Sequence, residues 1–253
     1  MELININGID YLIKREGCTA KNPYATVHKN IIFIRIPINL QREEGFRIFC
    51  ELKKRMIAKI KKSPARFKEK KNIEFHDSDR INLWGKNFIV SVKQGNGRGS
   101  YAHCKDEGEY KKICISLANS LNEEDKKRHV SNLTRRVISK ILLPSIMQYT
   151  GKINKEHFQV DVKKVFIKDH CSKWGSCSEK GNINLNFLLL FAPKEIFDYV
   201  VIHELAHMKV KNHSKEFWSI VQKVMPDYKE KIRWLKENGN ILSQISAKIS
   251  IKN

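Results

Sequence analysis

The sequence predicts an α+β fold: a β-rich N-terminal half with one long helix, then a helix, a sheet and two more helices. Two patterns predict it. Short alternating segments dominate before residue 120, and longer segments with apolar residues every three or four positions dominate after it. We expect residues 1–120 and 121–253 to form two subdomains. No linker rich in Gly, Ser or Pro separates them, so they can also form one continuous domain.

The composition is that of a globular protein. Of the 253 residues 41% are hydrophobic and 30% charged, with only 12 Gly and 6 Pro, which excludes a collagen-like or wholly disordered chain. The longest apolar run, Phe187–Ala192, is far shorter than the roughly 18 residues of a membrane helix. The first residues lack the basic and apolar regions of a secretory signal. We therefore expect a cytoplasmic protein without a membrane partner.

The first half contains strand patterns around one helical pattern. Phe46, Phe49, Leu52, Met56 and Ile60 follow helical spacing from Glu43 until Ser63-Pro64 ends the helix. Strands are expected at residues 9–14, 24–28, 30–36, 81–84, 87–92 and 112–117, with an antiparallel start. The glycine-rich segment 94–100 lacks the Lys-Ser/Thr ending of a phosphate loop and predicts a hairpin turn.

The second half begins with a helix capped by Asn122, whose first turn carries three acidic residues. This helix runs toward Pro144, which should kink it. Residues 162–168 and 182–187 alternate and predict two paired strands. From Pro193 onward apolar residues occupy every helical face, which predicts a buried helix.

The buried helix contains His203-Glu204-Leu205-Ala206-His207. Histidines four residues apart lie one helical turn from each other, so both imidazoles can bind one metal ion. Glu204 lies beside the pair and can reach a metal-bound water as a general base. Burying these polar groups without a partner would cost several kcal/mol, roughly, and a bound cation removes that cost.

A catalytic zinc ion needs a third protein ligand. His213 follows His207 at the spacing of H-E-x-x-H-x-x-G-x-x-H peptidases, although Val210 replaces the glycine of that pattern. His170, Glu216 and Asp227 are the alternatives. Ser214 should cap a following helix, whose apolar residues Phe217, Trp218, Val221, Val224 and Met225 predict packing against the metal helix.

Cysteine content and charge give further expectations. Cys18, Cys50, Cys104, Cys114, Cys171 and Cys177 are expected to be reduced thiols, and a zinc site at His170, Cys171 and Cys177 would lack a fourth ligand. The net charge of +21 favours a polyanionic partner, with basic runs at residues 51–72 and 126–140. These runs lack interleaved aromatic residues, so solvated helix faces explain them more simply than nucleic-acid binding does.

The sequence resembles the YgjP-like metallopeptidases, which share a zincin-type core with SprT-like proteins. The resemblance is carried by Lys173–Ser178, Gly181, Ile183, Leu185-Asn186, Pro193, Tyr199–Val201, His203–His207, Asn212–Ser214, Phe217-Trp218 and Pro226–Tyr228. It implies a zincin-like helix–sheet–helix core in residues 121–253. It also implies one zinc ion per chain on His203, His207 and His213, with Glu204 as the catalytic base and a peptide or protein as substrate.

The reaction expected from these residues is metal-assisted hydrolysis. Lys173, Tyr199, Tyr228 and His170 are candidate donors to the oxyanion, and Cys177 is interpreted as a small structural residue. Two alternatives stay open. The same site could hydrolyse a nucleotide or another phosphate ester, or the chain could be a non-catalytic, zinc-stabilised nucleic-acid-binding module. The sequence does not indicate the oligomeric state.

Overall fold

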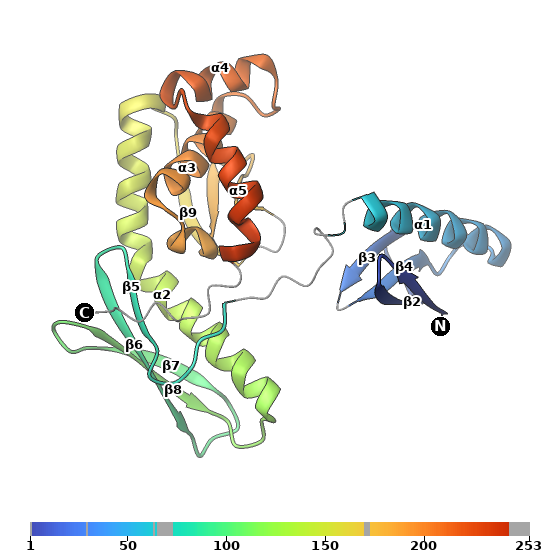
Figure 1. Cartoon of the computed structure of the whole chain (residues 1–253), viewed down its shortest axis with the longest axis horizontal. Coiled ribbons are helices and arrows are strands. Elements are labelled where there is room, and N and C mark those ends of the chain that lie inside the picture. The colour runs from blue at the N-terminus through green and yellow to red at the C-terminus, as the bar shows by residue number, and fades with distance from the viewer. Residues whose placement is uncertain (1, 29, 63, 65–72, 170–172, 243–253) are drawn as a thin grey trace. The chain divides into compact units, whose positions relative to one another are not determined.

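The structure, a computed structural model, describes residues 2–28, 30–62, 64, 73–169 and 173–242. The chain divides into an N-terminal unit, Met1–Lys70, and a C-terminal unit, Lys71–Asn253 (Figure 1). Each unit has its own hydrophobic core. The division falls at residue 70 and not at the expected boundary near residue 120, because the strands of residues 80–117 share one core with the helices that follow them.

The N-terminal unit is a four-stranded sheet covered by one helix. The sheet has the order β1-β2-β4-β3, formed by β1 (Glu2–Ile6), β2 (Ile9–Cys18), β3 (Tyr24–His28) and β4 (Ile31–Pro37). The outer pairs are antiparallel as expected, but β2 and β4 pair in parallel. Helix α1 (Arg42–Lys62) buries Met56 and Ile60 together with Ile32 and Ile34 of β4, and Phe49 and Leu52 pack against this core. The predicted apolar stripe is thus confirmed except at Phe46, which is exposed because it lies near the start of the helix, outside the core.

The C-terminal unit begins with a sheet of order β5-β6-β8-β7, formed by β5 (Arg80–Leu83), β6 (Lys86–Gln94), β7 (Tyr101–Asp106) and β8 (Lys111–Leu117). The hairpin predicted at residues 94–100 is wrong, because β8 lies between β6 and β7. Gly95 donates its N–H to the carbonyl of Leu117, 2.8 Å away, and a Cβ at Gly95 would clash with Oγ of Ser116. Glycine therefore lets the chain pass closely over β8.

Helix α2 (Glu123–Ile153) is the longest element of the fold. The Asn122 side chain accepts a hydrogen bond from the N–H of Asp125 at 2.8 Å, which confirms the predicted cap. The helix continues through Pro144 and is followed by a π-helical turn, Asn154–Phe158. It packs against β7 and β8 and also against β9 and α3, so the two sheets of this unit share one supporting helix (Figure 1).

The second sheet and the last helices carry the predicted site. The sheet has the order β10-β11-β9, formed by β9 (Lys164–Lys168), β10 (Gly175–Cys177) and β11 (Asn182–Asn186), with β9 and β11 parallel and β10 antiparallel to β11. A 3-10 turn, Phe187–Phe191, leads to α3 (Lys194–Lys209), α4 (Lys215–Val224) and α5 (Tyr228–Leu242). The predicted starts of α3 at Pro193 and of α4 at Ser214 are confirmed.

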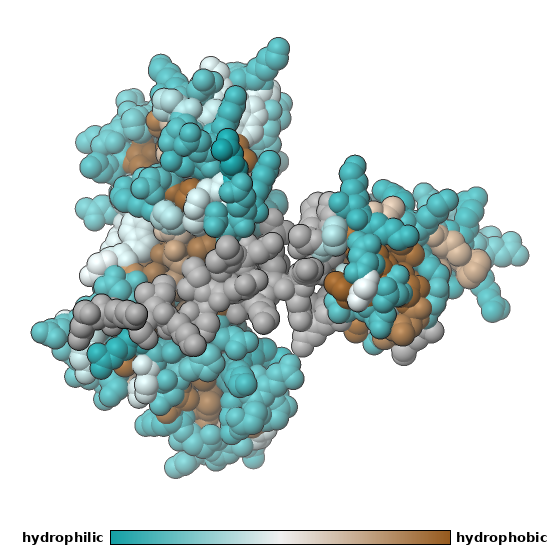
Figure 2. Space-filling model, in the orientation of Figure 1, coloured by the Kyte–Doolittle hydropathy of each residue, from teal (hydrophilic) through white to brown (hydrophobic). Residues whose placement is uncertain are grey.

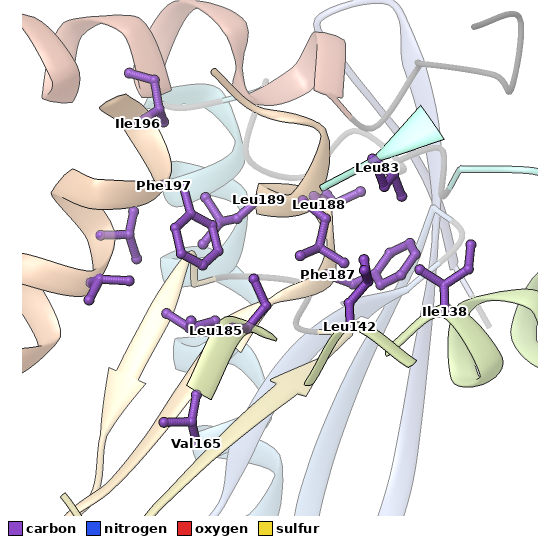
Figure 3. Packing of buried hydrophobic residues seen from close by; sticks show 14 of the residues in the cluster. Leu83, Ile138, Leu142, Val165, Leu185, Phe187, Leu188, Leu189, Ile196 and Phe197 are labelled. Carbon is purple, nitrogen blue, oxygen red and sulfur yellow. The ribbon is translucent and has the colours of Figure 1, made fainter. Parts of the chain in front are cut away.

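One continuous core joins these elements. Phe197 of α3 lies over Leu185 of β11, and Phe187 lies near Leu142 of α2 (Figure 3). The α+β prediction, with a helix-rich C-terminal region, is confirmed. Hydrophilic residues cover most of the visible surface of the C-terminal unit, whereas the visible face of the N-terminal unit also shows hydrophobic areas (Figure 2). Among the described helices, none combines the length and apolar composition that crossing a membrane requires.

Candidate metal centre

His203 and His207 lie on one side of helix α3, most of which is buried. Leu205 and Ala206 are fully buried between the two histidines, and Val200 and Val201 are buried one turn earlier. This apolar packing fixes the helix against the sheet and leaves the two imidazoles at its partly exposed edge. The predicted pairing of two ring nitrogens on one helical face is therefore present in the fold.

The turn after α3 brings a third imidazole to the pair. The helix ends at Lys209, Val210 is extended, and Ser214 caps α4 by accepting a hydrogen bond from the N–H of Phe217. The chain thus reverses within a few residues, and Nε2 of His213 lies 3.1 Å from Nε2 of His203 and 3.2 Å from Nε2 of His207. The extended Val210 explains how the turn forms without the glycine of the longer peptidase pattern.

The three histidines fit a zinc ion by geometry. Zn–N bonds of about 2.0–2.1 Å at tetrahedral angles place two ligand nitrogens about 3.3–3.4 Å apart. One ligand atom from each of His203, His207 and His213 lies within 4.8 Å of the other two. Among the described residues, no other group of three or more His, Cys, Asp or Glu side chains lies close enough together to hold one ion.

The protonation of the ligands also suits a metal. Burial, with added repulsion from His207 and His213, lowers the pKa of His203 to about 3, and burial likewise lowers the pKa of His207. Nδ1 of His207 lies 3.1 Å from the carbonyl oxygen of Val210, which can only accept, so Nδ1 carries the proton and Nε2 keeps its lone pair. Neutral imidazoles with free Nε2 lone pairs are what zinc requires.

Aromatic side chains from α4 and α5 support the ligands. The Phe217 ring lies with its centroid 4.9 Å from His203, 4.5 Å from His207 and 4.9 Å from His213. The Trp218 ring stacks on the His213 ring with a centroid distance of 5.6 Å. The Tyr228 ring in turn stacks on Trp218 with a centroid distance of 5.2 Å. The predicted bracing of the His213 turn by the following helix is confirmed, and Tyr228 at the start of α5 extends it.

Glu204 is buried beneath β10, with 4% of its surface exposed. A Cβ on Gly175 would lie 2.6 Å from Oε1 of Glu204, so the carboxylate occupies the space that any other residue would fill. Burial raises the pKa of Glu204 to about 7, although the charge of Lys173 and a backbone hydrogen bond from Cys177 oppose the rise. A carboxylate that titrates near neutrality is suited to take up and release a proton.

The histidines and Glu204 open into one cavity of about 630 Å³. Residues of β10 form one wall, and Ile232 and Leu235 of α5 contribute apolar surface. Two of the predicted oxyanion donors, Lys173 and Tyr199, also line it. Burial raises the pKa of Tyr199, so its hydroxyl keeps its proton at neutral pH.

The other candidates within the described part of the chain do not line this cavity. Tyr228 stacks on Trp218, Asp227 pairs with Lys231 at 2.7 Å, and Glu216 is an exposed residue of the first turn of α4. His170 and Cys171, considered as a ligand, an oxyanion donor or a second zinc site, lie outside the described residues. Sequence reasoning gave no role to Gly175, whose contact with Glu204 joins two elements that are distant in the chain.

The cysteines agree with a reduced protein. Cys18, Cys50, Cys104, Cys114 and Cys177 are free thiols, as expected, and they are the cysteines within the described part of the chain. Burial raises the pKa of the Cys177 thiol, and Sγ lies 3.2 Å from Sδ of Met208. A protonated thiol packed on a thioether supports the structural interpretation of Cys177.

Two histidines one helical turn apart, a third that converges on them and a buried glutamate define the centre of a metallopeptidase. The chain belongs to the YgjP-like family, whose metallopeptidase domain matches residues 21–238. It is therefore a metal-dependent hydrolase that acts on protein chains. The matched region includes most of the N-terminal unit as well as the site.

Two solved structures are similar to this chain. The metallopeptidase zymogen abylysin of Pyrococcus abyssi shares 31% identity over 38% of this chain and 93% of its own, with a TM-score of 0.32. The metallopeptidase zymogen jannalysin of Methanocaldococcus jannaschii shares 22% identity over 37% of this chain and 95% of its own, with a TM-score of 0.33. A search of curated proteins finds no match.

Proposed function

We propose that this metallopeptidase is a zinc-dependent endopeptidase that uses one zinc ion per chain. His203, His207 and His213 would hold the ion, and Glu204 would act as the general base. The observation that carries the proposal is the convergence of three Nε2 atoms, two of their separations being 3.1 and 3.2 Å, in the cavity that Glu204 also lines. Zinc is favoured because it accepts neutral imidazole nitrogens, which His203, His207 and His213 would supply.

When bound, zinc supplies Lewis-acid activation of water and of a substrate carbonyl. Glu204 accepts the proton that the attacking water loses and returns it to the nitrogen of the leaving amine as the peptide C–N bond breaks. Gly175 leaves room for this carboxylate next to β10. Tyr199 holds a protonated hydroxyl 3.4 Å from Nδ1 of His203, where it can orient that ligand or donate to negative charge that develops on the substrate.

The first test compares the zinc-loaded wild-type chain with a Glu204→Gln variant on an unfolded protein substrate. The amide keeps the size of Glu204 but cannot take up a proton, so turnover should fall by about 10²–10⁴-fold while bound zinc stays constant. Fragments identified by mass spectrometry distinguish internal cleavage from removal of terminal residues. Cleavage by Glu204→Gln at the parent rate, with zinc retained, would remove the general-base role.

The same samples address the two alternative functions. Incubation with nucleotides and other phosphate esters tests phosphate release from the same site, and a peptidase should release none that depends on Glu204. Nucleic-acid binding through the basic runs, including the part of residues 51–72 that belongs to α1, stays a prediction. It would show as an affinity that falls steeply with salt and does not change in Glu204→Gln.

A further inference from the structure

The cavity beside the metal centre is strongly cationic. Lys173, Lys211 and Lys236 line it, and among the described residues that line it Glu204 is the only acidic one. The three lysines come from separate places in the fold: the segment before β10, the turn after α3, and α5. All three are exposed, so their ammonium groups can reach a ligand that enters from solvent.

None of these lysines forms an ion pair in the described part of the chain. The ion pairs of the C-terminal unit that the structure describes join other residues, for example Lys231 with Asp227 and Lys194 with Asp198. Within the described residues, Lys211 and Lys236 therefore have no paired carboxylate, and Lys173 has only the buried Glu204 in its neighbourhood, with which it forms no ion pair. Since their like charges repel one another around one cavity, an anionic ligand would stabilise the arrangement.

The three charges also surround the reacting position. Lys173 directly precedes the residues of the wall beside Glu204, and Lys211 lies in the turn between His207 and His213. Lys236 follows Leu235 on α5, whose apolar side chain lines the same wall. A peptide bound across the centre would thus meet positive charge on more than one side of its scissile bond.

We infer that this cavity selects peptide substrates by carboxylate groups close to the scissile bond, and that Lys173, Lys211 and Lys236 determine the preference. The inference rests on the proposed peptidase function and specifies its substrate class. The carboxylates can belong to Asp or Glu side chains or to the free C-terminus of the peptide, and the experiment separates these two sources. Exposed lysines recognise a carboxylate as point charges, so the preference should weaken with added salt.

The cleavage experiment uses one quenched fluorescent peptide scaffold with Glu on both sides of the scissile bond and a second with Gln at the same positions. Each is made with a free and with an amidated C-terminus. We expect a ratio of kcat/KM for Glu over Gln peptides of about tenfold or more at low salt, as three exposed pairs would give. An effect confined to the free C-terminus would assign the recognised carboxylate to the chain end.

The variants test which lysines are responsible. The triple variant Lys173→Gln, Lys211→Gln, Lys236→Gln should bring the Glu/Gln ratio close to one. A matched triple variant, Lys140→Gln, Lys180→Gln, Lys229→Gln, removes the same charge at exposed positions that do not line the cavity, and it should keep the wild-type ratio. A wild-type Glu/Gln ratio near one together with equal cleavage of the free and amidated peptides would overturn the inference, and so would an equal loss of preference in both triple variants.

A binding measurement keeps this test separate from peptidase activity. Fluorescein-labelled Glu and Gln peptides are titrated with the zinc-loaded Glu204→Gln protein, which does not need to turn over. Tighter binding of the Glu peptide, lost in the cavity variant, supports the inference even where no cleavage is found. Equal affinities for the Glu and Gln peptides that do not change on C-terminal amidation, or no binding of either peptide, contradict the inference. Cleavage without a preference for either kind of carboxylate also contradicts it and leaves the peptidase proposal standing.

Discussion

The side chain of Glu204 fills the space next to Gly175 that a larger residue would need. A Cβ at Gly175 would lie 2.6 Å from Oε1 and 2.8 Å from Cγ of Glu204. Oε1 is the mobile end of the Glu204 side chain, but Cγ lies close to the backbone of α3, so an added Cβ would displace the whole carboxylate. The glycine of the short edge strand and the glutamate of the metal helix are therefore matched in size.

Gly175→Ala should displace the carboxylate and slow peptide cleavage by about 100-fold, because a shift of roughly 1 Å in a catalytic group has that effect. Zinc content, measured by elemental analysis, should stay at the wild-type value since no ligand is touched. Gly99→Ala is the control, because no atom lies within 4 Å of its added Cβ. Full activity in Gly175→Ala would show that the carboxylate position does not limit the reaction.

His213→Ala should abolish stable zinc binding. Two imidazoles on α3 remain, but a catalytic zinc site normally uses three protein ligands. Elemental analysis after gel filtration should give near one zinc per wild-type chain and far less in the variant. His157→Ala removes an exposed histidine at a distance from the triad in sequence and should keep the metal. Retained zinc in His213→Ala would assign the third ligand to another residue.

Trp218→Ala should weaken zinc binding without removing a ligand. The indole stacks on the His213 ring at 5.6 Å and is itself stacked on Tyr228, so its loss leaves the third ligand free to rotate. Supporting residues of this kind typically change metal affinity by about tenfold or more. Competition with a chromophoric chelator measures the change, and Trp218→Phe should recover part of it. Identical affinities for all three proteins would limit the stack to a packing role.

Asn122→Ala should lower the free energy of unfolding of the C-terminal unit by about 1 kcal/mol, the usual contribution of a helix cap. The lost hydrogen bond is the one from the N–H of Asp125, at 2.8 Å. Urea denaturation followed by circular dichroism measures the effect. Asn122→Ser keeps a capping oxygen and should stay within a few tenths of a kcal/mol, roughly, of the wild type. Equal losses in the two variants would argue against the cap.

Residue spacing predicts the site more completely than it predicts the fold. The interval between His203 and His207 depends only on helix geometry, so a local pattern suffices for this pair. Spacing left His170, Glu216 and Asp227 open beside His213, and only the resemblance to the family singled out His213. The contact of Gly175 with Glu204 and the stack of Trp218 on His213 depend on how separate elements pack, and no local pattern contains that information.

The elements that sequence reasoning missed have weak patterns. In β7 the residues Tyr101–Asp106 are nearly all exposed, so no alternation of buried and exposed positions identifies this edge strand. Helix α5 contains Lys, Glu, Asn and Gly in most positions and obtains its place through Leu235 and Tyr228. The order β5-β6-β8-β7 likewise follows from pairing across the sheet, and a loop of the same composition could serve a hairpin equally well.

Helix α2 contacts β7 and β8 and also β9 and α3, so it joins the two sheets of the C-terminal unit (Figure 1). One hydrophobic core includes residues from Ile73 to Leu235. The unit that carries the metal centre, Lys71–Asn253, is one compact body, so we expect no part of it to unfold separately. Heat should then melt it in a single cooperative transition, and damage at the Asn122 end should lower the melting temperature of the peptidase site itself.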